Sequence, residues 1–93
     1  MRQLVWGKTF IRAHRRAIQR YPDLQAEIER VLWLLADDPF APRLRTHKLK
    51  GKLAGVWACS ISYDLRLVFE FVKSEGDEDD LLLIEIGTHE EVY

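Results

Sequence analysis

The sequence lacks several features that mark secreted, membrane-bound or disulfide-linked proteins. Its single cysteine, Cys59, cannot form a disulfide within the chain, and because it stands in a strand-like run we interpret it as a buried thiol rather than a nucleophile. No apolar run approaches the roughly 18 residues of a membrane-spanning helix. Met1–Phe10 contains no signal-peptide core. We therefore expect no membrane contact and a location in the cytoplasm.

Motifs that bind nucleotides or metal ions are also missing. The sequence contains no P-loop and no GxGxxG, CxxC or HExxH pattern. Asp77, Asp79 and Asp80 superficially suggest a calcium loop, but the rest of an EF-hand pattern and its flanking helices are absent. The sequence therefore predicts no metal site and no small-molecule cofactor.

Positive charge is absent from residues 74–93. All 14 Lys and Arg lie in residues 1–73, where 7 acidic residues leave a charge of +7, whereas residues 74–93 hold 8 acids and carry −8. If the fold keeps these charges apart, the molecule has a polyanion-binding surface despite its net charge of −1. The alternative is that the acidic segment folds back and neutralises the basic one.

The bulk composition is that of a small globular protein. Of the 93 residues, 47% are hydrophobic and 31% are charged, which is typical of a folded chain and not of a disordered one. A chain of this length buries only about two thirds of its unfolded surface. We expect one domain covering residues 1–93, with little stability to spare.

The stretch Tyr63–Phe71, YDLRLVFEF, alternates so strictly that it predicts the central strand of a sheet. Its odd-numbered residues from Tyr63 onward are apolar or aromatic and are expected to face the core. Asp64 and Arg66 fall on the opposite face, roughly 7 Å apart along the strand. A carboxylate and a guanidinium on one face of a sheet form a suitable floor for a polar site.

The other elements follow from apolar periodicity and turn residues. Strands are predicted at Arg2–Trp6, Val56–Ile61 and Leu81–Ile86, and helices at Thr9–Arg20, with Thr9 as N-cap, and at Leu24–Ala36. Trp33 is expected in the interface between the helices. This order predicts an α+β fold: an N-terminal strand, an antiparallel two-helix hairpin and a three-stranded antiparallel meander, in one small sheet with the helices packed on one face.

The segment Phe40–Lys52 has no clean period and is interpreted as a basic loop. Its five cations surround His47 and can contact several phosphates at once; they are Arg43, Arg45, Lys48, Lys50 and Lys52. A plain solvated loop is the alternative.

The C-terminal segment Gly87–Tyr93 is expected beside the start of the central strand, because an antiparallel hairpin brings the end of one strand next to the start of the other. This pairing brings His89 close to Asp64 and Arg66. Metal-free cleavage of RNA needs a base, an acid and cations, and histidine suits proton transfer near neutral pH. The alternative is that His47 and His89 are structural or idle.

Three stretches together resemble the RelE/ParE superfamily of bacterial type II toxins, and most closely its YafQ-type mRNA interferases. They are HKLKG at His47–Gly51, YDLRLVF at Tyr63–Phe69 and IGTHEEVY at Ile86–Tyr93. The resemblance covers essentially the whole chain. It implies a ribosome-dependent endoribonuclease that cleaves mRNA in the ribosomal A site and is silenced by a cognate antitoxin.

The resemblance also implies roles for individual residues. His89 would be the general acid, His47 or Asp64 the base, and Arg66 a phosphate clamp. The last residue, Tyr93, would stack on a base. In one respect the sequence departs from the YafQ type, because Ser60 stands where those toxins carry a further histidine.

Two alternatives keep the fold and change the function. A ParE-like toxin would bind and inhibit DNA gyrase without catalysis and would not need His47 and His89. A toxin-like protein that has lost activity would serve only as a binding module in an antitoxin complex, an option that Ser60 leaves open.

Overall fold

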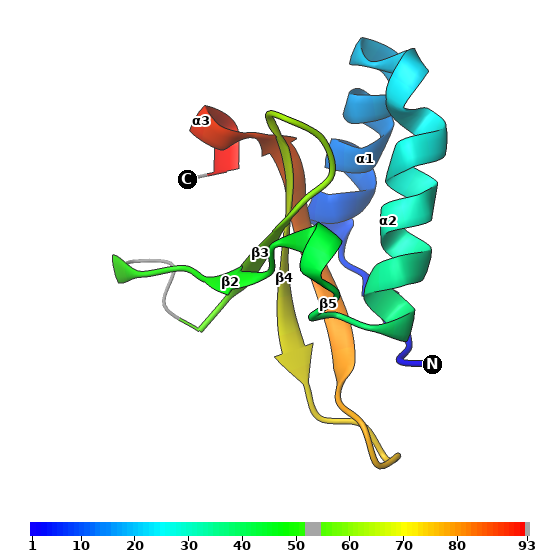
Figure 1. Cartoon of the computed structure of the whole chain (residues 1–93), viewed down its shortest axis with the longest axis vertical. Helices are drawn as coiled ribbons and strands as arrows, with labels where there is room; N and C mark the ends of the chain where they lie inside the picture. The colour runs from blue at the N-terminus through cyan, green and yellow to red at the C-terminus, as the bar shows by residue number, and fades with distance from the viewer. Residues whose placement is uncertain (52–54, 93) are drawn as a thin grey trace.

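A five-stranded sheet and a pair of helices form the two layers of the computed structural model, which describes residues 1–51 and 55–92 (Figure 1). The main elements are β1 (Leu4–Trp6), α1 (Lys8–Arg20), α2 (Gln25–Asp37), β2 (His47–Lys48), β3 (Trp57–Ser60), β4 (Leu65–Val72), β5 (Asp80–Thr88) and α3 (His89–Val92). Two 3-10 turns, η1 (Pro22–Leu24) and η2 (Pro42–Leu44), precede and follow α2. The predicted α+β fold is confirmed.

The strands lie in the order β1-β5-β4-β3-β2. β3, β4 and β5 form the predicted antiparallel meander, while β1 runs parallel to β5 and pairs Leu4 with Leu81. The fifth strand, β2, lies inside the segment that was predicted to be an irregular loop, and it pairs His47 with Ala58. Two residues are too few to produce a period, so β2 exists through its pairing with β3.

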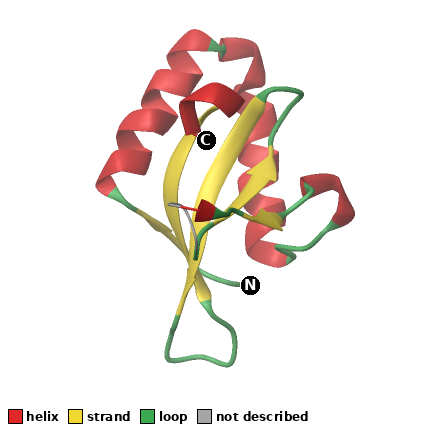
Figure 2. Ribbon diagram, turned by 90° about the vertical axis from the view of Figure 1, so that its left-hand side faces the viewer, coloured by secondary structure: helices red, strands yellow, loops and turns green. Residues whose placement is uncertain are grey.

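The core lies between the sheet and the pair α1 and α2, which cover one face of the sheet (Figure 2). α1 contributes Phe10, Ala13 and Ala17 at helical spacing, as its apolar stripe predicted. β4 contributes Leu65, Leu67 and Phe69, each at most 3% exposed, at the strand spacing. The apolar residues that recur at helical spacing in α1 and at strand spacing in β4 therefore pack together in one core layer.

β4 begins two residues later than predicted. Residues 61–64 form the turn from β3, so Tyr63 does not share the core face and is 98% exposed. The alternation of Leu65, Leu67 and Phe69 holds within the strand itself. A register shift against β5 occurs between Val68 and Phe69.

Two predictions about the helices are wrong. Thr9 does not cap α1; the N-cap is Gly7, whose N–H donates to the carbonyl of Leu83 at 3.3 Å. A Cβ at position 7 would lie 3.1 Å from that oxygen, so the close approach to β5 selects glycine. Trp33 lies outside the buried stripe that contains Val31 and Leu32, and it is 65% exposed.

No helix in residues 1–51 and 55–92 is both long enough and apolar enough to cross a lipid bilayer.

Candidate functional site

An open cavity of about 690 Å³ lies where the β3–β4 turn, the residues around η2 and the start of α3 meet. Its walls contain three arginines, two acids and one histidine. The lining residues are Arg43, Arg45, Ser60, Ile61, Ser62, Tyr63, Asp64, Arg66, Thr88, His89 and Glu90. Three of the four predicted catalytic residues, Asp64, Arg66 and His89, are among them.

The β3–β4 turn forms the floor of this cavity. It closes with a hydrogen bond from the Ile61 N–H to the carbonyl of Leu65 at 2.9 Å. The Arg66 Nη1 then reaches back over the turn and donates to the carbonyls of Ser62 at 3.0 Å and Tyr63 at 3.1 Å. Arg66 therefore brings a fixed positive charge to the cavity, held by backbone oxygens.

Asp64 and His89 are neighbours in the lining of the cavity. The backbone N–H of His89 donates to Oδ1 of Asp64 at 3.4 Å, although the two residues are 25 positions apart in the sequence. Register explains the contact, because Leu65 pairs with Thr88 and Arg66 with Gly87 at this end of the β4–β5 ladder. The predicted proximity of His89 to Asp64 and Arg66 is confirmed.

His47, the fourth predicted catalytic residue, is not among the residues that line this cavity. It lies on β2 opposite Ala58, whereas Arg66 lies opposite Ser60. The two residues therefore share a face of the sheet but are displaced by roughly 7 Å along the strands and roughly 10 Å across them. Nδ1 of His47 donates to the carbonyl of Arg45 at 2.9 Å, which fixes the orientation of the ring.

The predicted RNA-binding cations divide into two groups. Arg43 and Arg45 line the cavity, and Arg43 also forms an ion pair with Glu27 of α2. Lys48 and Lys50 are exposed on and beyond β2, with the Lys48 ammonium 5.4 Å from the centre of the Trp57 ring. Lys52 and Tyr93 lie outside the described residues.

Arg45 has an unusual backbone. At φ 52 and ψ 40 it is in the left-handed region, and it is the only residue other than glycine with positive φ in residues 1–51 and 55–92. A left-handed conformation costs an arginine roughly 1–2 kcal/mol relative to the ordinary helical one. Such strain occurs preferentially at functional sites, and here it ends η2 at the cavity wall.

The acidic segment does not fold back over these cations as a whole. The turn between β4 and β5, which holds Glu75 and Asp77, is at the opposite end of the ladder from α3 (Figure 1). Two acids of α3 do approach the basic side: Glu90 lines the cavity and Glu91 pairs with Arg20.

Sequence comparison assigns the chain to a family. The profile of a family described as the bacterial toxin of type II toxin-antitoxin system, YafQ, matches residues 2–93. The chain belongs to the YafQ family of type II toxins. No curated protein matches the sequence of this toxin.

Solved structures of related toxins share the fold. A YoeB/ParE toxin from Agrobacterium tumefaciens is 25% identical with a TM-score of 0.76, over 94% of this chain and 98% of that chain. YafQ from E. coli is 18% identical with a TM-score of 0.80, over 100% and 99%. YafQ in the E. coli DinJ-YafQ toxin-antitoxin complex is 18% identical with a TM-score of 0.77, over 99% and 97%. At 18% identity, the similarity to the two E. coli structures establishes a shared fold and no shared activity.

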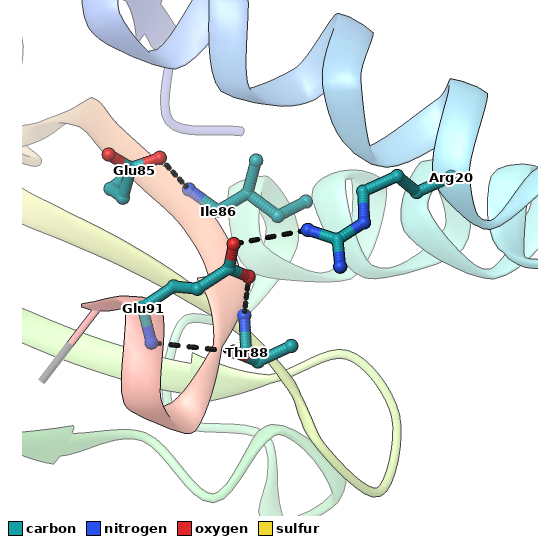
Figure 3. Close-up of polar contacts among 5 residues, drawn as sticks. All are labelled: Arg20, Glu85, Ile86, Thr88 and Glu91. Carbon is teal, nitrogen blue, oxygen red and sulfur yellow. Dashed lines mark hydrogen bonds and ion pairs between the residues drawn. The ribbon is translucent and has the colours of Figure 1, made fainter.

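The first turn of α3 is fixed by reciprocal hydrogen bonds in this YafQ-family toxin (Figure 3). The Glu91 carboxylate accepts from the Thr88 backbone N–H at 2.8 Å, and the Thr88 hydroxyl accepts from the Glu91 N–H at 3.3 Å. Arg20, the last residue of α1, donates to the other carboxylate oxygen at 3.2 Å. The hydrogen bond from Thr88 and the nearby Arg20 lower the pKa of Glu91 below its usual range.

Sequence reasoning missed Tyr63, Thr88 and Glu91. Tyr63 was expected in the core, but its ring is at the rim of the cavity, 98% exposed. The Ser-Tyr-Asp order after β3 is a turn signal that could have moved it out of the strand. Thr88-His-Glu-Glu91 is a T-x-x-E capping box, which could have revealed α3.

A metal centre has no support within residues 1–51 and 55–92, where no three His, Cys, Asp or Glu side chains gather closely enough to hold an ion. Ser60 is paired with Arg66 and lines the cavity. A hydroxyl therefore occupies that part of the wall.

Proposed function

We propose that this toxin is a metal-independent endoribonuclease that cleaves mRNA on the ribosome and thereby inhibits translation. The observation that carries the proposal is the cavity in which His89, Asp64 and Arg66 meet. RNA cleavage without a metal requires two proton-transfer groups and a fixed cation near the phosphate. These three side chains supply that set.

In the proposed reaction the 2′-oxygen of one ribose attacks the adjacent phosphorus, and the bond from phosphorus to the 5′-oxygen of the next nucleotide breaks. A base takes the proton of the 2′-hydroxyl, and an acid gives a proton to the departing 5′-oxygen. The products are a 2′,3′-cyclic phosphate and a 5′-hydroxyl. We assign the acid to His89, and the base to Asp64 in preference to His47, because His47 does not line the cavity.

Arginine side chains stabilise the negative charge that develops on the phosphate oxygens. Arg66 is held in place by the turn carbonyls, so little reorganisation is needed when that charge appears. Arg43 and Arg45 also line the cavity and add positive charge there. The exposed ring of Tyr63 offers a stacking surface for an unpaired base, a role that we also assign to Tyr93.

The basic segment carries the remaining contacts to RNA. Lys48 and Lys50 extend the positive surface along and beyond β2, Lys52 follows them in the sequence, and each phosphate that these lysines neutralise releases a counterion. RNA affinity should therefore fall steeply with salt. If the RNA affinity does not change with salt concentration, these lysines do not bind RNA through its phosphates and this part of the proposal is wrong.

The proposed partner between periods of activity is an antitoxin. E. coli YafQ occurs in a complex with DinJ, and membership of the same family supports an equivalent partner for this toxin. An acidic segment of that antitoxin would neutralise the cations around the cavity. Co-expression of the neighbouring gene product with the tagged toxin tests this: a stable complex and restored growth are expected.

Primer extension on mRNA from cells that express the toxin tests the nuclease activity. Wild type should produce new 5′ ends in register with codons, whereas His89→Ala and Asp64→Asn should reduce them roughly 100-fold or more. His14→Gln, which changes a histidine outside the cavity, is the matched control and should cleave normally. Growth arrest without new 5′ ends would overturn the proposal and favour a bound target such as gyrase.

A further inference from the structure

We propose that Glu91 and Arg20 are positioning residues of this site: together they fix the first turn of α3 and hold His89 beside Asp64. The inference rests on the proposed nuclease function, because it gives these two side chains a part in that reaction. Neither Glu91 nor Arg20 lines the cavity itself. Any effect they have on cleavage must therefore pass through the placement of their neighbours.

α3 needs external support because it is only four residues long, His89–Val92. Helices much shorter than about 12 residues are not stable in water by themselves. The capping box supplies part of the support, since the Glu91 carboxylate and the Thr88 hydroxyl each accept a backbone N–H of the other residue (Figure 3). Loss of the Glu91 side chain would leave the Thr88 N–H without this acceptor.

Arg20 ties this turn to α1. The Glu91 carboxylate uses one oxygen for Thr88 and the other for the Arg20 guanidinium, at 2.8 and 3.2 Å. The side chains of Arg20 and Glu91 are 56% and 45% exposed, so the ion pair adds little to overall stability. Its effect is geometric, because it connects the end of α1 to the turn that carries His89.

Gly87 permits this arrangement. A Cβ at position 87 would lie 3.2 Å from the Glu91 Cβ and 3.3 Å from Cγ1 of Val92. The chain at the end of β5 and the first turn of α3 are therefore in direct contact, on the side where Glu91 and Arg20 meet Ala17 and Ile86 in a small cavity. A side chain at Gly87 would push α3 outward.

The residues around the start of α3 therefore line two different cavities. Thr88, His89 and Glu90 line the large cavity, and the His89 N–H donates to Asp64. Glu91 belongs to the small cavity and not to the large one. A displacement of this turn by about 1 Å would move His89 relative to Asp64, and misplacements of that size reduce reaction rates by up to about 100-fold.

A series of variants tests the inference in a reconstituted cleavage assay that gives kcat and KM separately. Glu91→Ala should lower kcat roughly 10- to 100-fold with KM near the wild-type value. Glu91→Gln should recover most of the loss, because an amide oxygen can still accept the Thr88 N–H. Arg20→Met should fall between them. Arg12→Met is the matched control, since Arg12 is an exposed arginine of α1 that lines neither cavity.

Amide hydrogen exchange provides a second readout that does not depend on catalysis. In Glu91→Ala, amides of residues 88–92 should exchange at least about tenfold faster, while those of β4 and of residues 80–87 in β5 stay at wild-type rates. Unchanged exchange in α3, or a loss of kcat that Glu91→Gln does not recover, would overturn the positioning role. If wild type itself fails to cleave RNA, the proposed function fails, and the exchange result alone decides whether Glu91 holds α3.

Discussion

Nη1 of Arg66 lies 3.0 Å from the carbonyl oxygen of Ser62, so a side chain of β4 holds the backbone of the turn that precedes it. The same guanidinium lines the cavity. One residue therefore both shapes the floor of the site and supplies its charge. Substitutions at Arg66 should separate these two tasks.

Arg66→Lys should keep the positive charge and one hydrogen bond to the turn, but an ammonium lacks the planar fork of a guanidinium. Cleavage is expected to fall roughly 100-fold, the loss typical of one removed transition-state donor, with a small change in melting temperature. Arg66→Ala should lower both the cleavage rate and the melting temperature. Thermal unfolding and cleavage rates measured on the same preparations check this, and full activity in Arg66→Lys would show that the reaction does not need a guanidinium at this position.

Arg45→Gly should move stability and activity in opposite directions. Glycine adopts φ 52 without the steric cost that arginine bears, so the free energy of unfolding should rise by up to about 1 kcal/mol. Cleavage should fall because the cavity loses a guanidinium. Arg45→Ala is the control, since it removes the charge and keeps the strain. Urea unfolding distinguishes the two, and equal stabilities would contradict the strain argument.

His14 should make the fold less stable in acid. Burial beside Trp6 and Phe10 lowers the pKa of His14, and the negative charge of Glu29 on α2 opposes that shift. Two cations, Arg2 and Arg15, also line the cavities around the ring. Between the lowered pKa and the ordinary value of 6.5, the unfolded chain binds more protons, so stability declines as pH falls through 6.5. Urea unfolding above and below that pH should show a shallower decline in His14→Gln. An unchanged slope would contradict this.

Cys59 should resist thiol reagents in the folded protein. Burial leaves it 0% exposed and raises the pKa of its thiol to about 12, and the thiolate is the reactive form. Labelling should be very slow in buffer and fast in denaturant, which serves as the internal control. Rapid stoichiometric labelling of the native protein would show that β3 opens or that the thiol is accessible.

The sequence predicts those features of the site that are determined within one strand or one hairpin. Leu65, Leu67 and Phe69 could be assigned to the core because alternation in one strand records burial directly. The approach of His89 to Asp64 followed from antiparallel pairing alone. These features need only the order of the strands and their direction.

Features that depend on neighbouring elements could not be predicted in this way. β2 is two residues long and leaves no periodic signal, so the displacement of His47 from the cavity became visible only with its pairing to Ala58. Tyr63 fits the alternation of β4 but belongs to a turn that Arg66 holds. Its exposure follows from a tertiary contact.

The acidic turn between β4 and β5 gives the toxin a permanent electric dipole along its sheet. Val72 pairs with Asp80 at one end of the ladder and Leu65 with Thr88 at the other, roughly 23 Å away by the rise of the strand. The acidic residues of segment 74–80 lie at the first end, and three arginines line the cavity at the second. In the field of a polyanion the molecule would rotate so that its acidic end points away, and it would arrive with the cavity facing the phosphates.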